Sequence, residues 1–394
     1  MMNKKALFCL VTALFWCSLY AYVPQLGSFA KTLGASYRMI GLIAGSYGIS
    51  QTLLRIPLGV ISDILGKRKI FIVIGSLVTV VSAFLVFVVP SPITLLVGRF
   101  LAGIAAATWV NFTVMYAGYY EHNESPKAVG IINSVNRAGQ FIAMLAGGII
   151  SLYLGMRHVF LFSTIIGAAA AALSFTIKEE RCINDSGPFK LSDMVLFLKK
   201  KEVIIISTLG ALSQLITYGT TFGFTPVVAF NLGASYYQLG IMSMLFVLPQ
   251  ILVSALSGSL LMDKLGERNT LLAGFAINTV LSVVIPFVPW LRALYVVQIF
   301  NGIGMALTFP LLTGLVIRNI PDRLRNAVMG FYQAIFGLGM IAGPILLGTV
   351  GDKYGLIAGF MAVGFMGLLA ITLTIFYYLS RKMSYKSLVE GGKR

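Results

Sequence analysis

The string Leu33-Gly34-Ala35-Ser36-Tyr37 occurs a second time, unchanged, as Leu232-Gly233-Ala234-Ser235-Tyr236. A glycine follows each copy, and the pattern D-x-L-G-x-R then appears as Asp63 to Arg68 and again as Asp263 to Arg268. An offset of 199 to 200 residues in a chain of 394 indicates that one half is a copy of the other. Internal repeats of this size determine the architecture, so the chain is predicted to contain two matched halves.

The composition is that of a membrane protein, with 58% hydrophobic and 11% charged residues, whereas soluble domains carry about 25% charged residues. An apolar helix needs about 20 residues to cross the hydrocarbon core of a bilayer. Stretches of this length occur at 6–26, 38–61, 70–89, 93–117, 127–153, 157–177, 203–228, 238–261, 270–289, 292–316, 327–350 and 355–379. We therefore predict an all-α membrane protein with 12 transmembrane helices, in which the helices satisfy the backbone polar groups inside lipid.

The positive charges are unevenly distributed, although the formal net charge is +17. If the N-terminus is inside, Lys and Arg divide as 22 in cytoplasmic segments, 5 in external segments and 3 within helices. This asymmetry follows the positive-inside rule and predicts that both termini are cytoplasmic, in a multi-pass protein of the cell (cytoplasmic) membrane. The loops are too short to form a nucleic-acid-binding face, so we expect a small-molecule substrate and contact with the lipid bilayer rather than with nucleic acid.

The repeat and the polar stretches give the domain organisation. We predict an N-terminal six-helix half at 1–177, a cytoplasmic central linker at 178–202, a C-terminal six-helix half at 203–381 and a cytoplasmic tail at 382–394. The linker is expected to hold a short amphipathic helix over 191–198. Because six is an even number, the halves are parallel repeats, and a solute site is expected between them near the midplane of the membrane.

The stretch from Gly59 to Lys69 forms the loop between the second and third helices. It resembles the loop signature of the major facilitator superfamily, G-x-x-x-D-x-x-G-R-[KR]-[KR], and a weaker copy follows at Asp263, Gly266 and Arg268. Gly59 would allow close helix packing, and Gly66 a tight turn. The resemblance implies that Asp63, with Gly66 and Arg68, gates the cytoplasmic side by holding the two halves together in one conformation. The alternative is a solvated turn that only obeys the positive-inside rule.

The fourth helix carries R-x-x-x-G-x-x-A-A from Arg99 through Gly103 to Ala107. This is similar to an element of the drug and metabolite antiporter branches of the superfamily, and the similarity implies that Arg99 assists proton transfer. A charge inside the membrane is costly and is by default a functional candidate. The alternative is a structural arginine bonded to helix carbonyls. The equivalent residue in the second half is the neutral Gln298.

The fifth helix carries a polar stripe, because Asn133, Asn136, Arg137 and Gln140 follow one another at helical spacing. We expect it to face a cavity or another helix. The antiporter element G-x-x-x-G-P-x-x-G-G is in register in this helix but lacks its Gly-Pro pair, which occurs in the eleventh helix as Gly343-Pro344 and predicts a kink there. The missing pair weakens the evidence for proton-driven export.

No acidic residue lies in the middle of any predicted helix. The expected pathway instead contains Tyr20, Gln214, Tyr218 and Gln298 beside the two arginines, and net positive charge there would favour neutral or anionic solutes over cations. Each aromatic residue could also be a packing or interfacial residue.

The sequence lacks the Walker A, H-E-x-x-H, C-x-x-C and G-x-S-x-G motifs, so we expect neither an enzyme nor a bound cofactor or metal. The first functional expectation is a monomeric secondary transporter that exports a drug-like compound or metabolite by alternating access, with the proton gradient as its energy source. The alternatives are uptake or facilitated transport of a neutral or anionic solute and, more remotely, a non-transporting receptor.

Overall fold

The structure is a computed structural model that describes residues 3–121, 124–179, 200–256, 262–318, 320 and 322–391. The expected amphipathic helix over 191–198 and the side chain of Asp263 lie outside the described residues. Within the described residues every regular element is helical, which confirms the predicted all-α class.

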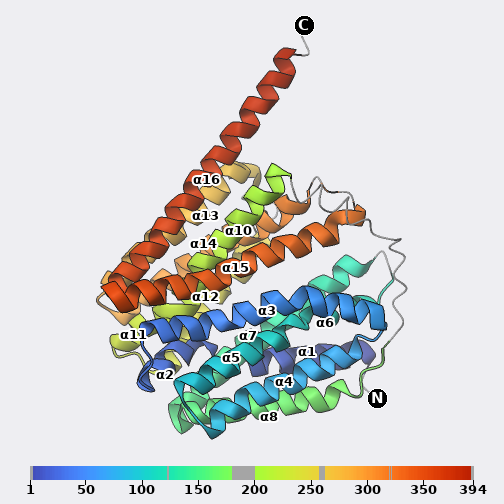
Figure 1. Cartoon of the computed structure of the whole chain (residues 1–394), viewed down its shortest axis with the longest axis vertical. Helices are drawn as coiled ribbons and strands as arrows, with labels where there is room; N and C mark the ends of the chain where they lie inside the picture. Colours follow the sequence, from blue (N-terminus) through green and yellow to red (C-terminus); the bar gives the residue numbers. More distant parts are fainter. Residues whose placement is uncertain are drawn as a thin grey trace. The chain divides into compact units, whose positions relative to one another are not determined.

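The first repeat begins with a broken helix and continues with long ones (Figure 1). In chain order its elements are α1 (Lys4–Tyr20), η1 (Val23–Gln25), α2 (Leu26–Thr32), α3 (Tyr37–Leu65), α4 (Lys69–Val88), α5 (Pro92–Ala107), α6 (Trp109–Ala117), α7 (Ser125–Leu154) and α8 (Met156–Ser174).

The second repeat follows the same order. Its elements are α10 (Lys201–Gly219), η3 (Thr220–Phe224), α11 (Thr225–Asn231), α12 (Tyr236–Leu256), α13 (Met262–Val284), η5 (Ile285–Phe287), α14 (Leu291–Ile317), α15 (Asp322–Tyr354) and α16 (Leu356–Gly391). Ten of the resulting spans are long and apolar enough to cross a membrane. Helices α3 and α12, of 29 and 21 residues, occupy the positions of the remaining two predicted spans.

The residues group into two compact units. The first contains residues 1–187, 222–244 and 289–291, and the second contains 188–221, 245–288 and 292–394. Helix α11 and the beginning of α12 therefore belong to the first unit, although in sequence they belong to the second repeat.

Equivalent helices pack in equivalent ways inside each unit. In the first unit α1 packs against α7 and α8, and α4 packs against α8; in the second, α10 packs against α15 and α16, and α13 against α16. Small residues permit the closest approaches, as expected for helices in a bilayer. A Cβ atom at Gly147 would lie 1.8 Å from the carbonyl oxygen of Ala21, and one at Gly339 would lie 1.9 Å from that of Ala211.

The repeated LGASY strings form matched turns. Gly34 and Gly233 have φ angles of 83° and 87°, in the left-handed region that glycine enters without steric cost. Two residues later each string supplies a helix N-cap: the hydroxyl of Ser36 accepts a hydrogen bond from the backbone of Met39, and that of Ser235 from the backbone of Gln238. The identical strings therefore specify identical turns.

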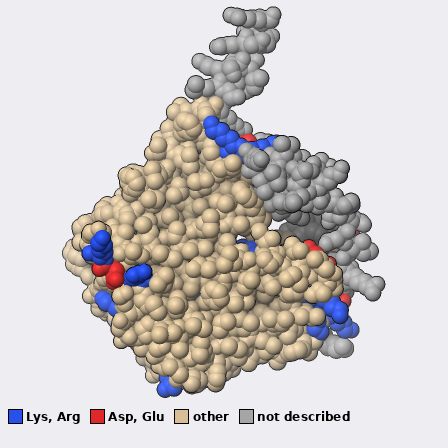
Figure 2. Space-filling view, viewed as in Figure 1, with Lys and Arg blue, Asp and Glu red and all other residues tan. Residues whose placement is uncertain are grey.

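Apolar side chains dominate the molecular surface. Figure 2 shows that Lys, Arg, Asp and Glu gather at a few places on the visible face, while the rest of the described surface carries other residues. Leu53, Val81 and Ile93 on three different helices are 65%, 55% and 68% exposed. Such a surface is suited to lipid, and the chain is a multi-pass membrane protein.

Candidate functional site

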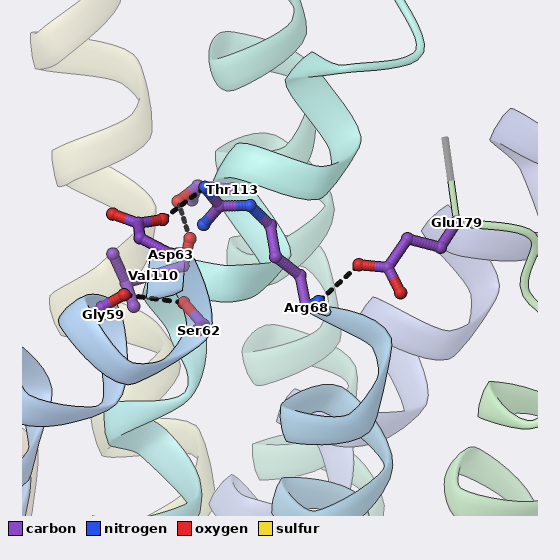
Figure 3. A network of polar contacts seen from close by, with 7 residues as sticks. All are labelled: Gly59, Ser62, Asp63, Arg68, Val110, Thr113 and Glu179. Carbon is purple, nitrogen blue, oxygen red and sulfur yellow. Dashed lines mark hydrogen bonds and ion pairs between the residues drawn. The ribbon is translucent and has the colours of Figure 1, made fainter. Parts of the chain in front are cut away.

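The loop between α3 and α4 is held by an ion pair (Figure 3). Gly66 ends α3 in the left-handed conformation with a φ of 61°, and Arg68 then precedes α4. This turn brings Nη2 of Arg68 to 2.5 Å from Oδ1 of Asp63. The arginine side chain is 10% exposed and the aspartate 50%, so one side of the pair remains accessible. Gly59 is less constrained, because an added Cβ would meet Val110 at an ordinary 3.8 Å.

A carboxylate that sequence reasoning missed completes this network. Glu179, beyond the end of α8, accepts a hydrogen bond from the backbone N–H of Arg68 at the beginning of α4 (Figure 3). Nζ of Lys69 donates to the carbonyl oxygen of Phe175 at 2.6 Å. The free N–H groups and partial positive charge at a helix N-terminus favour a carboxylate there. Residues 111 positions apart therefore fasten this turn to the end of the first repeat.

Among the described residues, the second copy of the loop holds an ion pair that involves Glu267. Gly266 again adopts a positive φ, 71°, whereas Arg268 is exposed and makes no ion pair with a described residue. Glu267 is the acid next to Gly266. Its Oε1 lies 2.6 Å from Nη2 of Arg318, which follows α14. That hydrogen bond raises the pKa of the Arg318 guanidinium above its ordinary value. The turn is repeated, and next to it the second copy holds an ion pair between Glu267 and Arg318.

Arg99 is a buried cation, and two of its three guanidinium nitrogens have no hydrogen-bond partner among the described residues. It is 5% exposed, and its Nε and Nη1 atoms are enclosed without a partner. Its nearest described aromatic partner is Tyr47 on α3, whose ring centroid lies 4.2 Å from the guanidinium carbon. The nearby α5 carbonyl of Phe100 is bonded by the hydroxyl of Ser50 at 2.6 Å. Within the described residues, Nε and Nη1 of Arg99 therefore donate to no helix carbonyl.

Gly103 explains how α3 and α5 come so close. A Cβ at Gly103 would lie 2.3 Å from the carbonyl oxygen of Tyr47. The second unit repeats this contact, because a Cβ at Gly302 would lie 2.3 Å from the carbonyl oxygen of Phe246. Both pairs are related by the offset of 199 residues, and the residue equivalent to Arg99 is Gln298. Gln298 is fully buried and accepts a hydrogen bond from Asn301 at 3.2 Å.

Three of the four residues of the polar stripe predicted on the fifth span are joined by hydrogen bonds on α7. Nη1 of Arg137 donates to Oε1 of Gln140 at 3.3 Å, and Nε2 of Gln140 donates to Oδ1 of Asn136 at 2.6 Å. Asn136 and Gln140 are buried, whereas Arg137 and Asn133 are exposed. Asn133 bonds the carbonyl oxygen of Val129 in its own helix and stands apart from the other three.

The remaining predicted pathway residues lie in the interiors of their units. Tyr20 is buried, with its ring 5.7 Å from that of Trp16, and Gln214 is buried in α10, while Tyr218 is partly exposed. Sequence reasoning missed Asn111, which is fully buried on α6 with neither amide atom hydrogen-bonded. A break in the fourth span at Thr108 precedes it, and hydropathy gives no sign of such a break.

The predicted Gly-Pro pair lies within α15. Gly343 approaches α10 so closely that a Cβ would meet the carbonyl oxygen of Leu215 at 2.1 Å, and Pro344 follows inside the continuous helix. Its counterpart α7 has no proline in its interior. The pair therefore marks a tight helix contact within the second unit.

Inside the first unit, the two LGASY turns are close to one another. Helix α2 packs against α11 just before each turn. The hydroxyl of Ser28 donates to the carbonyl oxygen of Pro226 at 2.9 Å, and Nζ of Lys31 donates to the side chain of Asn231. The seam between α2 and α11 is thus held by hydrogen bonds, and the charged Lys31 in it is bonded to the neutral amide of Asn231.

This architecture defines a class: a duplicated, multi-pass helical membrane protein with polar and charged residues inside its helices. The model of the Major Facilitator Superfamily matches residues 8–224 and again residues 206–393, and the chain belongs to that superfamily of transporters.

Relatives of similar length support this membership. An uncharacterised MFS-type transporter of Methanocaldococcus jannaschii is 29% identical over 84% of this chain and 87% of its own. The multi-drug resistance efflux pump PmrA of Streptococcus pneumoniae is 24% identical over 88% of each chain. The solved structure of the nucleoside transporter NupG covers 96% of this chain and 99% of its own with a TM-score of 0.75 at 17% identity, which shows the shared fold.

Proposed function

We propose that this chain is a secondary transporter that exports a small organic solute by alternating access, in exchange for protons. The observation that carries this proposal is the match of both repeats to the superfamily, together with relatives of similar length that are named efflux pumps. The proton gradient is the energy source that the Arg99 element implies. We further propose a monomer in the cell membrane, with the Asp63 loop and both termini in the cytoplasm, because this side carries most of the Lys and Arg residues.

The pair of Asp63 and Arg68 is proposed to gate the cytoplasmic side. Its half-exposed carboxylate can exchange partners, while Glu179 keeps the turn anchored. Asp63→Asn should therefore lower turnover more than solute binding. Glu124→Gln is the matched control, because Glu124 forms an exposed surface pair with Lys127 and such pairs contribute little. Unchanged turnover in Asp63→Asn would argue against the gate.

Transport is tested with purified protein in liposomes. A lipophilic cation, a neutral sugar and an organic anion are offered with and without an imposed pH gradient. Export predicts solute movement that accelerates when the gradient is imposed, and proton exchange predicts a matching pH change. Tight binding of a solute without any flux would instead support a receptor.

A second candidate function is passage of a neutral or anionic solute without proton exchange. One observation favours it: Nε and Nη1 of Arg99 are buried without a partner among the described residues, and the sequence places no acid in the middle of any helix that could carry a proton. In the same liposomes, this function predicts flux of the sugar or the anion that is unaffected by the pH gradient.

A further inference from the structure

Arg99 lies well inside the membrane-spanning part of the first unit. It follows Pro92, the first residue of α5, by seven positions, which is about 10 Å along a helix that rises 1.5 Å per residue. The hydrocarbon core is about 30 Å thick, so this position lies about a third of the way into the core where α5 begins at its surface. Its 5% exposure agrees with this depth.

Among the described residues, no carboxylate forms an ion pair with Arg99. All 13 acidic residues of the sequence fall in loops or at helix ends. The Tyr47 ring contributes a cation–π interaction, yet such an interaction is weaker than the cost of removing a cation from water. Two guanidinium nitrogens also remain without hydrogen bonds. A buried cation of this kind is suited to a partner that is anionic and comes from outside the chain.

The second repeat shows that the fold does not need the charge. The helix contact at Gly103 is reproduced at Gly302 with the same 2.3 Å approach, although the equivalent of Arg99 there is Gln298. Oε1 of that amide accepts a hydrogen bond from Asn301 within its own helix, while its Nε2 is buried without a partner among the described residues. A neutral side chain therefore satisfies the same architecture, and the arginine of the first repeat serves another purpose.

We infer that Arg99 binds the negatively charged group of the transported solute, and that this solute is a small organic anion. The inference rests on the proposed transport function and specifies its substrate class. A guanidinium presents N–H groups in a planar fork that matches carboxylate, sulfonate and phosphate oxygens. Because the Tyr47 ring covers one face of the guanidinium, the anion binds at its N–H edge.

The first experiment measures thermal unfolding without any ligand. Arg99→Gln removes an unpaired buried cation and installs the residue of the second repeat, so Tm should stay constant or rise by about 1–4 °C. Arg157→Gln is the matched control, because Arg157 donates to the carbonyl oxygens of Phe87 and Val88 and is a structural arginine. Its loss should lower Tm. An equal fall in both variants would overturn the inference.

The second experiment measures binding with matched probes. Benzenesulfonate and glycerol 3-phosphate should raise the Tm of the wild-type protein, whereas their neutral counterparts benzenesulfonamide and glycerol should have less effect. Arg99→Gln should weaken binding of the anions about tenfold or more. Arg99→Lys should weaken it less, because lysine keeps the positive charge but not the planar fork of N–H groups. Failure of both anions to bind the wild type, or equal binding by Arg99→Gln, would overturn the inference.

Flux of the same probes separates this inference from the proposed function. Arg99-dependent anion binding without flux under any gradient would leave the anion site standing and refute transport. Flux of the neutral probes that is unaffected by Arg99→Gln would support transport and refute the anion site.

Discussion

Replacing Gly147 by alanine should destabilise the first unit, whereas the same replacement at Gly130 in the same helix should not. A Cβ at Gly147 would lie 1.8 Å from the carbonyl oxygen of Ala21, while ordinary contact begins at 3.4 Å. The obstacle is backbone, which cannot rotate away as a side chain can. The two helices would therefore have to separate locally by about 1.6 Å, enough to lose much of the dispersion energy at this contact.

The expected magnitude follows from two opposing terms. Overpacking costs about 1–3 kcal/mol, and the upper end applies here because the obstacle is rigid. Alanine in place of glycine in a helix stabilises the folded protein by about 1 kcal/mol. The net loss of about 2 kcal/mol should lower Tm by about 4–8 °C in a unit of this size. At Gly130 nothing lies within 4 Å of the added atom, so only the favourable term remains.

The assay is thermal unfolding of the purified protein in detergent, with intrinsic tryptophan fluorescence as the probe. Wild type, Gly147→Ala and Gly130→Ala are compared under identical conditions. Gly130→Ala should match or exceed the wild-type Tm by about 2–4 °C. If Gly147→Ala melts at or above the wild-type temperature, the close contact between α1 and α7 is not a constraint on stability and the reasoning fails.

Three further predictions concern the turns, the seam and the driving force. Gly66→Ala should lower Tm, because the φ of 61° at this position costs a residue with a Cβ about 1–2 kcal/mol. Gly59→Ala should be tolerated, because its Cβ would meet Val110 at an ordinary 3.8 Å. An equal Tm in both variants would contradict this. We expect the seam between α2 and α11 to open during transport. Asn231→Asp should then give Lys31 an ionic partner and slow turnover by up to about fivefold without altering solute affinity, and Lys31→Gln in the same protein should restore the rate. Turnover insensitive to both changes would show that the seam does not open during transport. An inside-negative potential should accelerate export of a monoanion, because it adds about 2.3 kcal/mol per 100 mV to the driving force, or about twice that when one proton enters in exchange. The reversal potential in liposomes distinguishes these two cases. Efflux indifferent to the potential would refute an anionic solute.

The duplication made the fold predictable. Identical LGASY strings gave identical turns, with positive φ angles at Gly34 and Gly233 and serine N-caps after both. Hydropathy then located the spans, because a residue's transfer into lipid depends on its own chemistry. Hydropathy does not locate the breaks within spans, such as the one at Thr108, because changing the backbone geometry of an apolar segment leaves its hydrophobicity unchanged.

The candidate site was predictable only where its partners are close in sequence. The stripe of Asn136, Arg137 and Gln140 follows from helical spacing alone. The cap that Glu179 provides for α4 does not, because it joins residues 111 positions apart and no local pattern marks the acid as a partner. Likewise, the sequence shows Arg99 within a helix but cannot show that its nitrogens lack hydrogen bonds, since that depends on which side chains occupy the nearby carbonyls.

A duplicated chain provides its own control for the role of each buried polar residue. Where both repeats keep the same residue at the same contact, as at Gly103 and Gly302, the backbone requires it, because a Cβ would meet a carbonyl oxygen at 2.3 Å in both. Where the contact is kept and the side chain differs, as at Arg99 and Gln298, packing does not explain the difference. The amide is the less costly solution in a membrane because it is neutral, although its Nε2 also lacks a partner among the described residues. Retention of an unpaired cation in one repeat therefore requires a compensating interaction that this repeat makes during its function, and an anionic solute supplies it.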